Sequence, residues 1–450
     1  MKKIKQTVHK VEDNSQITEN YNDIQINREE GGGLEKRHFS MSPKYVLFFS
    51  FTVLALTILY WLFLLFTRSA NVDAYFVTDH TNTAMDYFNM LANINNIDPY
   101  HASANYPALC FVFFRIMHRF LQLPANGLYP DAYALRTDMV AQLGYILYII
   151  VCLIIIWETI KYSCKGSMIE KVLFSTALFL SGPMIFLLER GNILLIVLAC
   201  MLMFLVLYDS TSKTNRIIAY IFLAIAAALK IYPAVFGILV ICKKRYKEAI
   251  LLVIMGIMIF LVPFFAFDGI GSIKAMLAGL SAATEAQTGI GLGHNYSLDN
   301  LFKLVAAFAG KQVIVTPSWI LGLGIFICFV LFIISKMEWQ RLYALTLLCI
   351  WFPSFSYTYT LVLFFLPIIS FFFRNEERSE KKFNIMYIVL FVFLLIPYAL
   401  PLISRINEIT NFGNLMLPVS WGTVIINCVL VLMAVLIFVE NVCKKLRRSR

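Results

Sequence analysis

The stretch that decides the fold is Tyr45–Phe66, which reads YVLFFSFTVLALTILYWLFLLF and contains no charged side chain. A helix rises about 1.5 Å per residue, and about 20 apolar residues suffice to cross the hydrocarbon core of a bilayer. This stretch therefore predicts a transmembrane helix. Two other segments, Ala249–Phe267 and Leu417–Val439, have the same length and character.

The composition of the whole chain agrees with this prediction. Of the 450 residues, 60% are hydrophobic and 14% are charged, and the mean hydropathy is +0.74. Soluble globular chains contain about 25% charged residues. The composition therefore excludes a water-soluble globular protein and predicts an all-α polytopic membrane protein.

The formal charge of +11 comes from basic residues that lie in short clusters beside the apolar segments. Lys2, Lys3 and Lys5 precede the first segment, KKRYK occupies 243–247, and the chain ends in KKLRRSR. Because cytoplasmic loops of membrane proteins are rich in Lys and Arg, the clusters indicate topology and not nucleic-acid binding. We predict a multi-pass plasma-membrane protein with cytoplasmic N- and C-termini.

Alternating the segments across the membrane divides the chain into regions. Residues 1–43 are polar and predict a disordered cytoplasmic tail, 44–440 the transmembrane domain, and 441–450 a basic cytoplasmic C-terminus. Two stretches, 67–138 and 268–317, are predicted to be long loops on the outside. Connections are usually about 4 to 6 residues long, and much longer ones are usually functional.

About twelve transmembrane helices are predicted in total. Val172–Leu188 is predicted as a single span, and Pro107–Leu123, which is apolar but carries Arg115, as a helix lying in the membrane interface. Ile217–Cys242 starts and ends beside basic clusters, so it predicts two short helices or a re-entrant segment that breaks near Lys230. The remaining spans are predicted at 139–157, 193–208, 318–335, 342–353, 360–373 and 385–404.

The first outside loop concentrates the acidic residues, Asp73, Asp79, Asp86 and Asp98. A carboxylate in such a loop can accept a proton from a sugar hydroxyl as a general base. Loops also carry acids for solubility, so the spacing alone leaves both interpretations open. The nine cysteines lie mostly inside apolar segments, where Cys behaves as a small hydrophobe, and they predict neither a disulfide framework nor a metal site.

The first outside loop contains three short motifs, Met85–Asn89 (MDYFN), Asp98-Pro99-Tyr100 and Tyr106–Leu109 (YPAL). They resemble the signature of the first external loop in glycosyltransferase family 87. Three later strings follow in the family's order, namely Glu189–Asn192 (ERGN), Leu229–Pro233 (LKIYP) and His294–Leu298 (HNYSL). Two positions depart from the family pattern, because Ala108 replaces a second proline and no acidic residue follows Asn192.

The resemblance covers about residues 45–300 and implies a GT-C fold and a hexosyltransferase-type enzyme. Such an enzyme takes mannose, or another hexose or pentose, from a polyprenyl-phosphate donor and transfers it to a lipid or glycan acceptor on the outer face. The partners implied are membrane lipids, the polyprenyl-phosphate sugar and the acceptor. No cofactor and no metal are implied.

The resemblance also assigns roles to residues. Asp86 takes the place of the catalytic general base in an inverting transfer that releases polyprenyl phosphate. Arg190 and Lys230 are the candidates for binding the phosphate, although Arg190 also suits an interfacial cation and Lys230 a buried structural pair. His294 is predicted either to donate to the phosphate or to cap its loop, and Asn192, Asn295, Tyr232 and Tyr106 to hydrogen-bond sugar or phosphate. Tyr87, Tyr100 and Tyr106 flank the acid and are candidates for stacking on sugar.

Two other functions remain open from the sequence. A transporter or flippase of lipid-linked glycans also needs cationic residues at depth, and a glycan polymerase or ligase has a similar topology. A transporter predicts paired broken helices in corresponding halves of the chain, whereas only one break, at Lys230, is evident. The acids of the first outside loop favour the enzyme.

Overall fold

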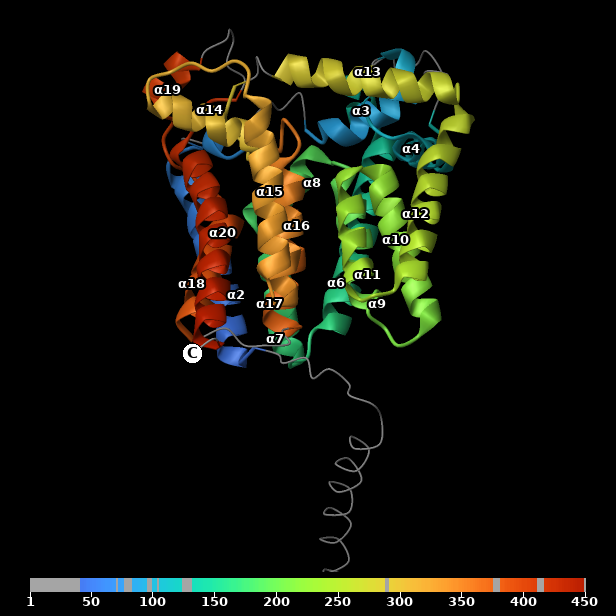
Figure 1. The fold of residues 1–450 in the computed structure, drawn as a ribbon. Coiled ribbons are helices and arrows are strands. Elements are labelled where there is room, and N and C mark those ends of the chain that lie inside the picture. The colour runs from blue at the N-terminus through green and yellow to red at the C-terminus, as the bar shows by residue number, and fades with distance from the viewer. Residues whose placement is uncertain are drawn as a thin grey trace, which may run out of the picture. The chain divides into compact units, whose positions relative to one another are not determined.

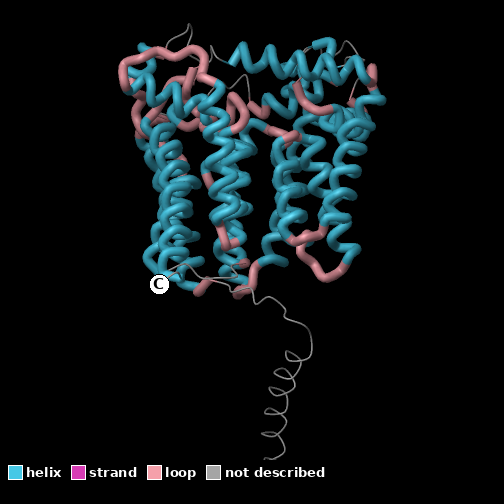
Figure 2. Tube along the Cα trace, viewed as in Figure 1, coloured by secondary structure: helices cyan, strands magenta, loops and turns pink. Residues whose placement is uncertain are grey.

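The computed structural model describes residues 41–69, 72–76, 83–94, 99–102, 105–123, 132–287, 291–374, 381–410 and 417–448. The described residues belong to one compact unit. The predicted tail, residues 1–43, lies almost wholly outside the described residues. Figure 2 shows the described chain as helices joined by loops, and this part contains no strand beyond two isolated bridge pairs.

Four described helices are long and apolar enough to cross a membrane, or five if a bent pair counts as one span. The four are α2 (Pro43–Phe66), α6 (Met139–Ser163), α12 (Tyr246–Leu261) with its 3-10 extension η5 (Val262–Ala266), and α20 (Trp421–Arg448). They confirm the membrane-spanning character predicted from the apolar segments. The total of about twelve spans stays a prediction.

The bent pair occupies the span predicted at 172–188 and adds a bend that the sequence analysis did not predict. Helix α7 (Met168–Phe179) and helix α8 (Gly182–Arg190) meet at an angle of 56°. Pro183 lies in the first turn of α8, and because proline has no amide hydrogen it cannot continue α7. A Cβ at Gly182 would lie 2.3 Å from the Tyr75 hydroxyl, so the bend also allows close packing.

The predicted break near Lys230 is confirmed. Helix α10 (Lys213–Leu229) ends at Lys230, whose backbone is extended, and the 3-10 helix η4 (Tyr232–Gly237) and the short α11 (Ile238–Cys242) follow. Pro233 again lies in the first turn after the break. The α-helix is therefore interrupted at a lysine that lies within an apolar stretch.

The remaining apolar helices pack around these elements. They are α9 (Leu194–Leu207), α15 (Ser318–Ile334), α16 (Glu338–Trp351), η6 (Thr358–Phe364), α17 (Phe365–Phe373) and α18 (Lys381–Leu395). Helix α9 packs on α6 and α10, and α16 packs on α15 and α17. Every residue of α17 is buried, so this helix forms part of the core.

Short helices gather at one end of the long ones, where α3, α4, α13, α14 and α19 lie in Figure 1. These and their neighbours are η1 (Val72–Ala74), α3 (Met85–Asn93), η3 (Pro99–Ala102), α4 (Ala108–Phe120), α5 (Ala132–Thr137), α13 (Ile270–Gln287), α14 (Leu298–Phe308) and α19 (Ser404–Ile409). Helix α4 matches the helix predicted at 107–123. The predicted loop 268–317 instead contains two helices, α13 and α14.

Two predicted boundaries near the C-terminus differ from the structure. The span predicted at 385–404 ends at Leu395, because Pro397 and Pro401 interrupt the helix. The basic segment predicted at 441–450 continues helix α20 as far as Arg448.

Candidate active site

Asp86 lies in the first turn of α3, at the end of the molecule where the short helices gather. Its Oδ1 accepts a hydrogen bond from Arg190 Nη2 at 3.2 Å, and its Oδ2 accepts one from Asn192 Nδ2 at 2.6 Å. The side chains of Arg190 and Asp86 are only 10% and 17% exposed. Screening by solvent is weak in such a place, so the carboxylate and guanidinium form a firm ion pair.

The turn Glu189–Asn192 aims both partners at Asp86. Helix α8 ends at Arg190, and Gly191 adopts a left-handed φ of 64° with its N–H donating to Leu187 O at 3.0 Å. Asn192 is fixed from both sides, since its Oδ1 accepts from Leu194 N at 3.0 Å and its carbonyl from the Tyr148 hydroxyl at 3.0 Å. Arg190 and Asn192 thus reach the two oxygens of one carboxylate.

Replacing Gly191 with alanine is expected to displace α3 from this turn. The new Cβ would lie 2.8 Å from Tyr87 Cβ and would also impose left-handed strain. We expect the thermal midpoint to fall and any transferase activity to fall with it, the strain alone costing about 1 kcal/mol or more. Gly310→Ala is the matched control, because Gly310 has a φ of 73° with open space around it. Equal losses in the two variants would contradict the packing argument.

Tyr106 contacts both Lys230 and Asn192, the hydrogen-bonding partner of the Asp86 carboxylate. Asn192 Nδ2 also donates to Tyr106 Oη at 3.1 Å, and Lys230 Nζ lies 4.1 Å from the centroid of the Tyr106 ring. Burial, and secondarily the charge of Asp86, raise the pKa of the Tyr106 hydroxyl well above its usual value. The hydroxyl therefore keeps its proton and can donate it to a ligand.

Lys230 forms no ion pair among the described residues. Its ammonium makes no hydrogen bond there either and lies 4.1 Å from the centroid of the Tyr106 ring, with Asp86 near enough to interact with it electrostatically. An ammonium in apolar surroundings without an acceptor is costly unless a ligand or water supplies one. The arrangement suits an anionic group bound beside Tyr106.

Two tyrosines that the sequence analysis did not select border the site. The guanidinium of Arg190 lies 5.9 Å from the centroid of the Tyr357 ring, and Tyr357 stacks on Tyr359 at 5.5 Å. They belong to FPSFSYTYT, residues 352–360, which connects the spans predicted at 342–353 and 360–373. The alternation of aromatic and hydroxyl residues there was the available signal.

The other predicted residues lie around this cluster. His294 packs against Phe186, one turn before Arg190 on α8, at a ring distance of 5.9 Å. The Oδ1 of Asn295 accepts from Ser297 N and Ser356 N at 3.1 and 2.9 Å. The Tyr87 and Tyr100 rings are buried against other aromatic rings, so they are not available for stacking on sugar. Asp79, Asp98 and the side chain of Asp73 lie outside the described residues.

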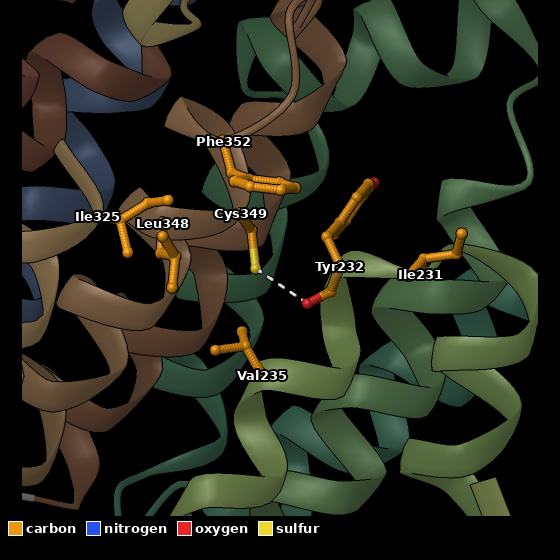
Figure 3. A pocket seen from close by; sticks show the side chains of 7 residues that line it. All are labelled: Ile231, Tyr232, Val235, Ile325, Leu348, Cys349 and Phe352. Atoms are coloured by element: carbon orange, nitrogen blue, oxygen red, sulfur yellow. Dashed lines mark hydrogen bonds between the residues drawn. The ribbon is translucent and has the colours of Figure 1, made fainter. Parts of the chain in front are cut away.

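Tyr232 lines an open apolar cavity of about 270 Å³ just past the break in α10. Figure 3 shows its wall, which is formed by Ile231, Tyr232, Val235, Ile325, Leu348, Cys349 and Phe352. The Tyr232 carbonyl accepts a hydrogen bond from Cys349 Sγ at 3.4 Å. An apolar cavity is therefore lined by the residues that directly follow Lys230.

The arrangement provides a carboxylate that can accept a proton, cations that can bind an anionic group, and an apolar cavity that can take a hydrocarbon chain. The described residues contain no group of three or more His, Cys, Asp or Glu side chains that could hold a metal ion. Fold and site together define a membrane-embedded helical protein with a carboxylate and cations at one end of its helices.

The family model of glycosyltransferase family 87 matches residues 106–363. The match covers more than half of the 450 residues, and the chain belongs to glycosyltransferase family 87. It includes Tyr106, Arg190, Lys230 and Tyr357, whereas Asp86 precedes it. Comparisons with curated proteins and with solved structures found no match.

Proposed function

We propose that this glycosyltransferase moves a sugar from a polyprenyl-phosphate donor to a hydroxyl of a lipid or glycan acceptor on the extracytoplasmic face of the plasma membrane. The fold would be of the GT-C type, with both termini in the cytoplasm. One observation carries the proposal: the carboxylate of Asp86 lies in one polar cluster with Lys230, and the two residues that follow this lysine line an apolar cavity.

A polyprenyl-phosphate donor fits the arrangement of Lys230, Tyr106 and the apolar cavity. Its single phosphate would pair with Lys230 and take a hydrogen bond from Tyr106, and the first isoprene units would enter the cavity beside Tyr232. Arg190 is already paired with Asp86, so Lys230 is the cation that would face the phosphate. His294, Asn192 and Asn295 would support the site, and His294 stays a candidate phosphate ligand.

The reaction would be a single displacement with inversion. Asp86 accepts the proton of the acceptor hydroxyl while that oxygen bonds to the anomeric carbon of the sugar. The bond between this carbon and the phosphate oxygen breaks, and its electron pair leaves on polyprenyl phosphate. Lys230 stabilises the charge that grows on the leaving phosphate. No cofactor takes part in these steps.

The direct test is transfer by the purified protein in proteoliposomes. Undecaprenyl-phosphate sugars (mannose, glucose, galactose and arabinofuranose) would be offered with a lipid extract as acceptor, beside nucleotide sugars carrying the same residues. We expect transfer from at least one lipid-linked donor and none from the nucleotide donors. Transfer only from nucleotide sugars would overturn the proposal.

Filling the cavity is expected to discriminate between donors by chain length. Val235→Trp should weaken use of a donor with a long polyprenyl chain about 10- to 100-fold, because each methylene excluded from apolar surroundings costs ~0.8 kcal/mol. A ten-carbon donor, measured by the same initial rates, should be affected much less. The matched control is Ile254→Trp, on a face of α12 where Ile254 is 54% exposed. Equal loss with both donors would place the lipid chain elsewhere.

The bend between α7 and α8 gives a specific reason to keep the transporter as second candidate. Broken helices do line transport pathways, and the structure contains two breaks, at Ser181 and at Lys230. Both lie within residues 168–242, however, and not in corresponding halves of the chain. Scrambling of a fluorescent lipid-linked glycan in proteoliposomes without sugar donor would establish the transporter, and its absence favours the enzyme.

A further inference from the structure

The segment between α16 and η6 runs along the candidate site. Phe352 at its start lines the apolar cavity, and Tyr357 at its end meets the guanidinium of Arg190. The hydroxyl of Tyr357 makes no hydrogen bond within the described residues, and its side chain is partly exposed. Tyr357 therefore brings an uncommitted hydroxyl to the ion pair of Arg190 and Asp86.

A second segment, His294–Ser297, holds this one in place. Asn295 and Tyr357 form an antiparallel bridge, and Tyr296 N donates to Ser356 O at 2.9 Å. The Asn295 Oδ1 receives Ser356 N, while the Ser297 hydroxyl donates to Ser354 O at 2.9 Å. Asn295 is 3% exposed, and its Oδ1 fixes the backbone next to Tyr357.

Tyr357 and Lys230 are connected to different oxygens of the Asp86 carboxylate. Asn192 donates to Oδ2 and to Tyr106, whose ring faces Lys230, whereas Arg190 donates to Oδ1 and lies beside the Tyr357 ring. If the donor phosphate pairs with Lys230, a sugar held next to Asp86 can reach Tyr357. Burial raises the pKa of the Tyr357 hydroxyl, and Arg190 lowers it by less, so this hydroxyl stays protonated and can donate.

We infer that Tyr357 contacts the transferred sugar by hydrogen-bonding one of its hydroxyls, and that Asn295 is the positioning residue that holds Tyr357 there. This inference rests on the proposed function. It adds a determinant of sugar specificity in the second half of the chain. A polar wall group distinguishes sugars because a hydroxyl of the wrong configuration leaves it unpaired.

The test compares binding of undecaprenyl phosphate with binding of the undecaprenyl-phosphate sugar that the wild type transfers fastest. Tyr357→Phe removes only the hydroxyl, and we expect affinity for the sugar-bearing donor to fall about 3- to 10-fold, the loss typical of one neutral hydrogen bond. Affinity for undecaprenyl phosphate should not change. Tyr246→Phe is the matched control, since Tyr246 is 60% exposed on α12.

Variants of Asn295 test the positioning role. Asn295→Ala should reproduce the selective loss, Asn295→Asp should restore part of it by keeping acceptor oxygens for Ser356 N, and Asn295→Ala with Tyr357→Phe should lose no more than either alone. A mere loss of stability would instead weaken the binding of both ligands.

The outcomes separate the inference from the proposed function. If the wild type neither binds undecaprenyl phosphate nor transfers a sugar from it, the proposed function fails, and the inference fails with it. If the wild type does both and Tyr357→Phe binds every donor normally, the inference alone fails. It also fails if Tyr357→Phe weakens undecaprenyl phosphate equally, or raises only the KM for the acceptor.

Discussion

Replacing Asp86 with asparagine is expected to reduce sugar transfer about 10²- to 10⁴-fold, the contribution typical of a general base. Asparagine has nearly the same shape, and its Oδ1 can still accept the hydrogen bond from Arg190 that reaches Asp86 at 3.2 Å. It cannot take the proton of an acceptor hydroxyl. The loss should therefore appear in kcat, measured as transfer from the preferred undecaprenyl-phosphate sugar.

The variant must also be shown to fold, because Arg190 loses its countercharge and is only 8% exposed. Size-exclusion profiles and affinity for undecaprenyl phosphate should stay close to the wild type, since Lys230 is unchanged. Asp299→Asn is the matched control, as Asp299 forms an ion pair with Lys303 on α14 at 2.8 Å. Wild-type turnover by Asp86→Asn would contradict the role of this carboxylate as the general base.

The long apolar helices were predictable because their signal is local. A run such as Tyr45–Phe66 contains its own evidence for α2, and the break at Lys230 was visible because a charge and a proline interrupt an apolar run. The bend at Gly182 was missed because Pro183 lies inside a strongly apolar stretch that hid it. Helices α13 and α14 were missed because their mixed composition resembles that of a loop.

The candidate site was partly accessible from the sequence for a different reason. The motifs around Asp86, Asn192, Tyr106 and Lys230 are short, but their order resembled a known family, and the structure brings these side chains together. Tyr357 was not accessible in this way. Its place beside Arg190 depends on pairing of two distant segments through Asn295, which no local pattern reveals.

Replacing Lys230 with methionine is expected to weaken binding of undecaprenyl phosphate about 10- to 100-fold, because a hydrogen bond to a charged group is worth ~1.5 to 3 kcal/mol. Methionine keeps the length and apolar stem of lysine. The affinity would be measured by quenching or by competition with a labelled donor, and Lys274→Met, a change of an exposed lysine on α13, is the control.

The thermal stability of the Lys230→Met variant distinguishes a role of Lys230 in phosphate binding from a structural role. If Lys230 were half of a buried ion pair, removing it would leave an uncompensated charge and destabilise the fold, typically by about 3 to 5 kcal/mol. Its ammonium forms no ion pair among the described residues and lies 4.1 Å from the centroid of the Tyr106 ring. The thermal midpoint of Lys230→Met without ligand should therefore equal or exceed that of the wild type. The shift that undecaprenyl phosphate gives the wild type should disappear. A large drop in the ligand-free midpoint, with ligand binding retained, would make Lys230 structural and leave the phosphate without its principal partner.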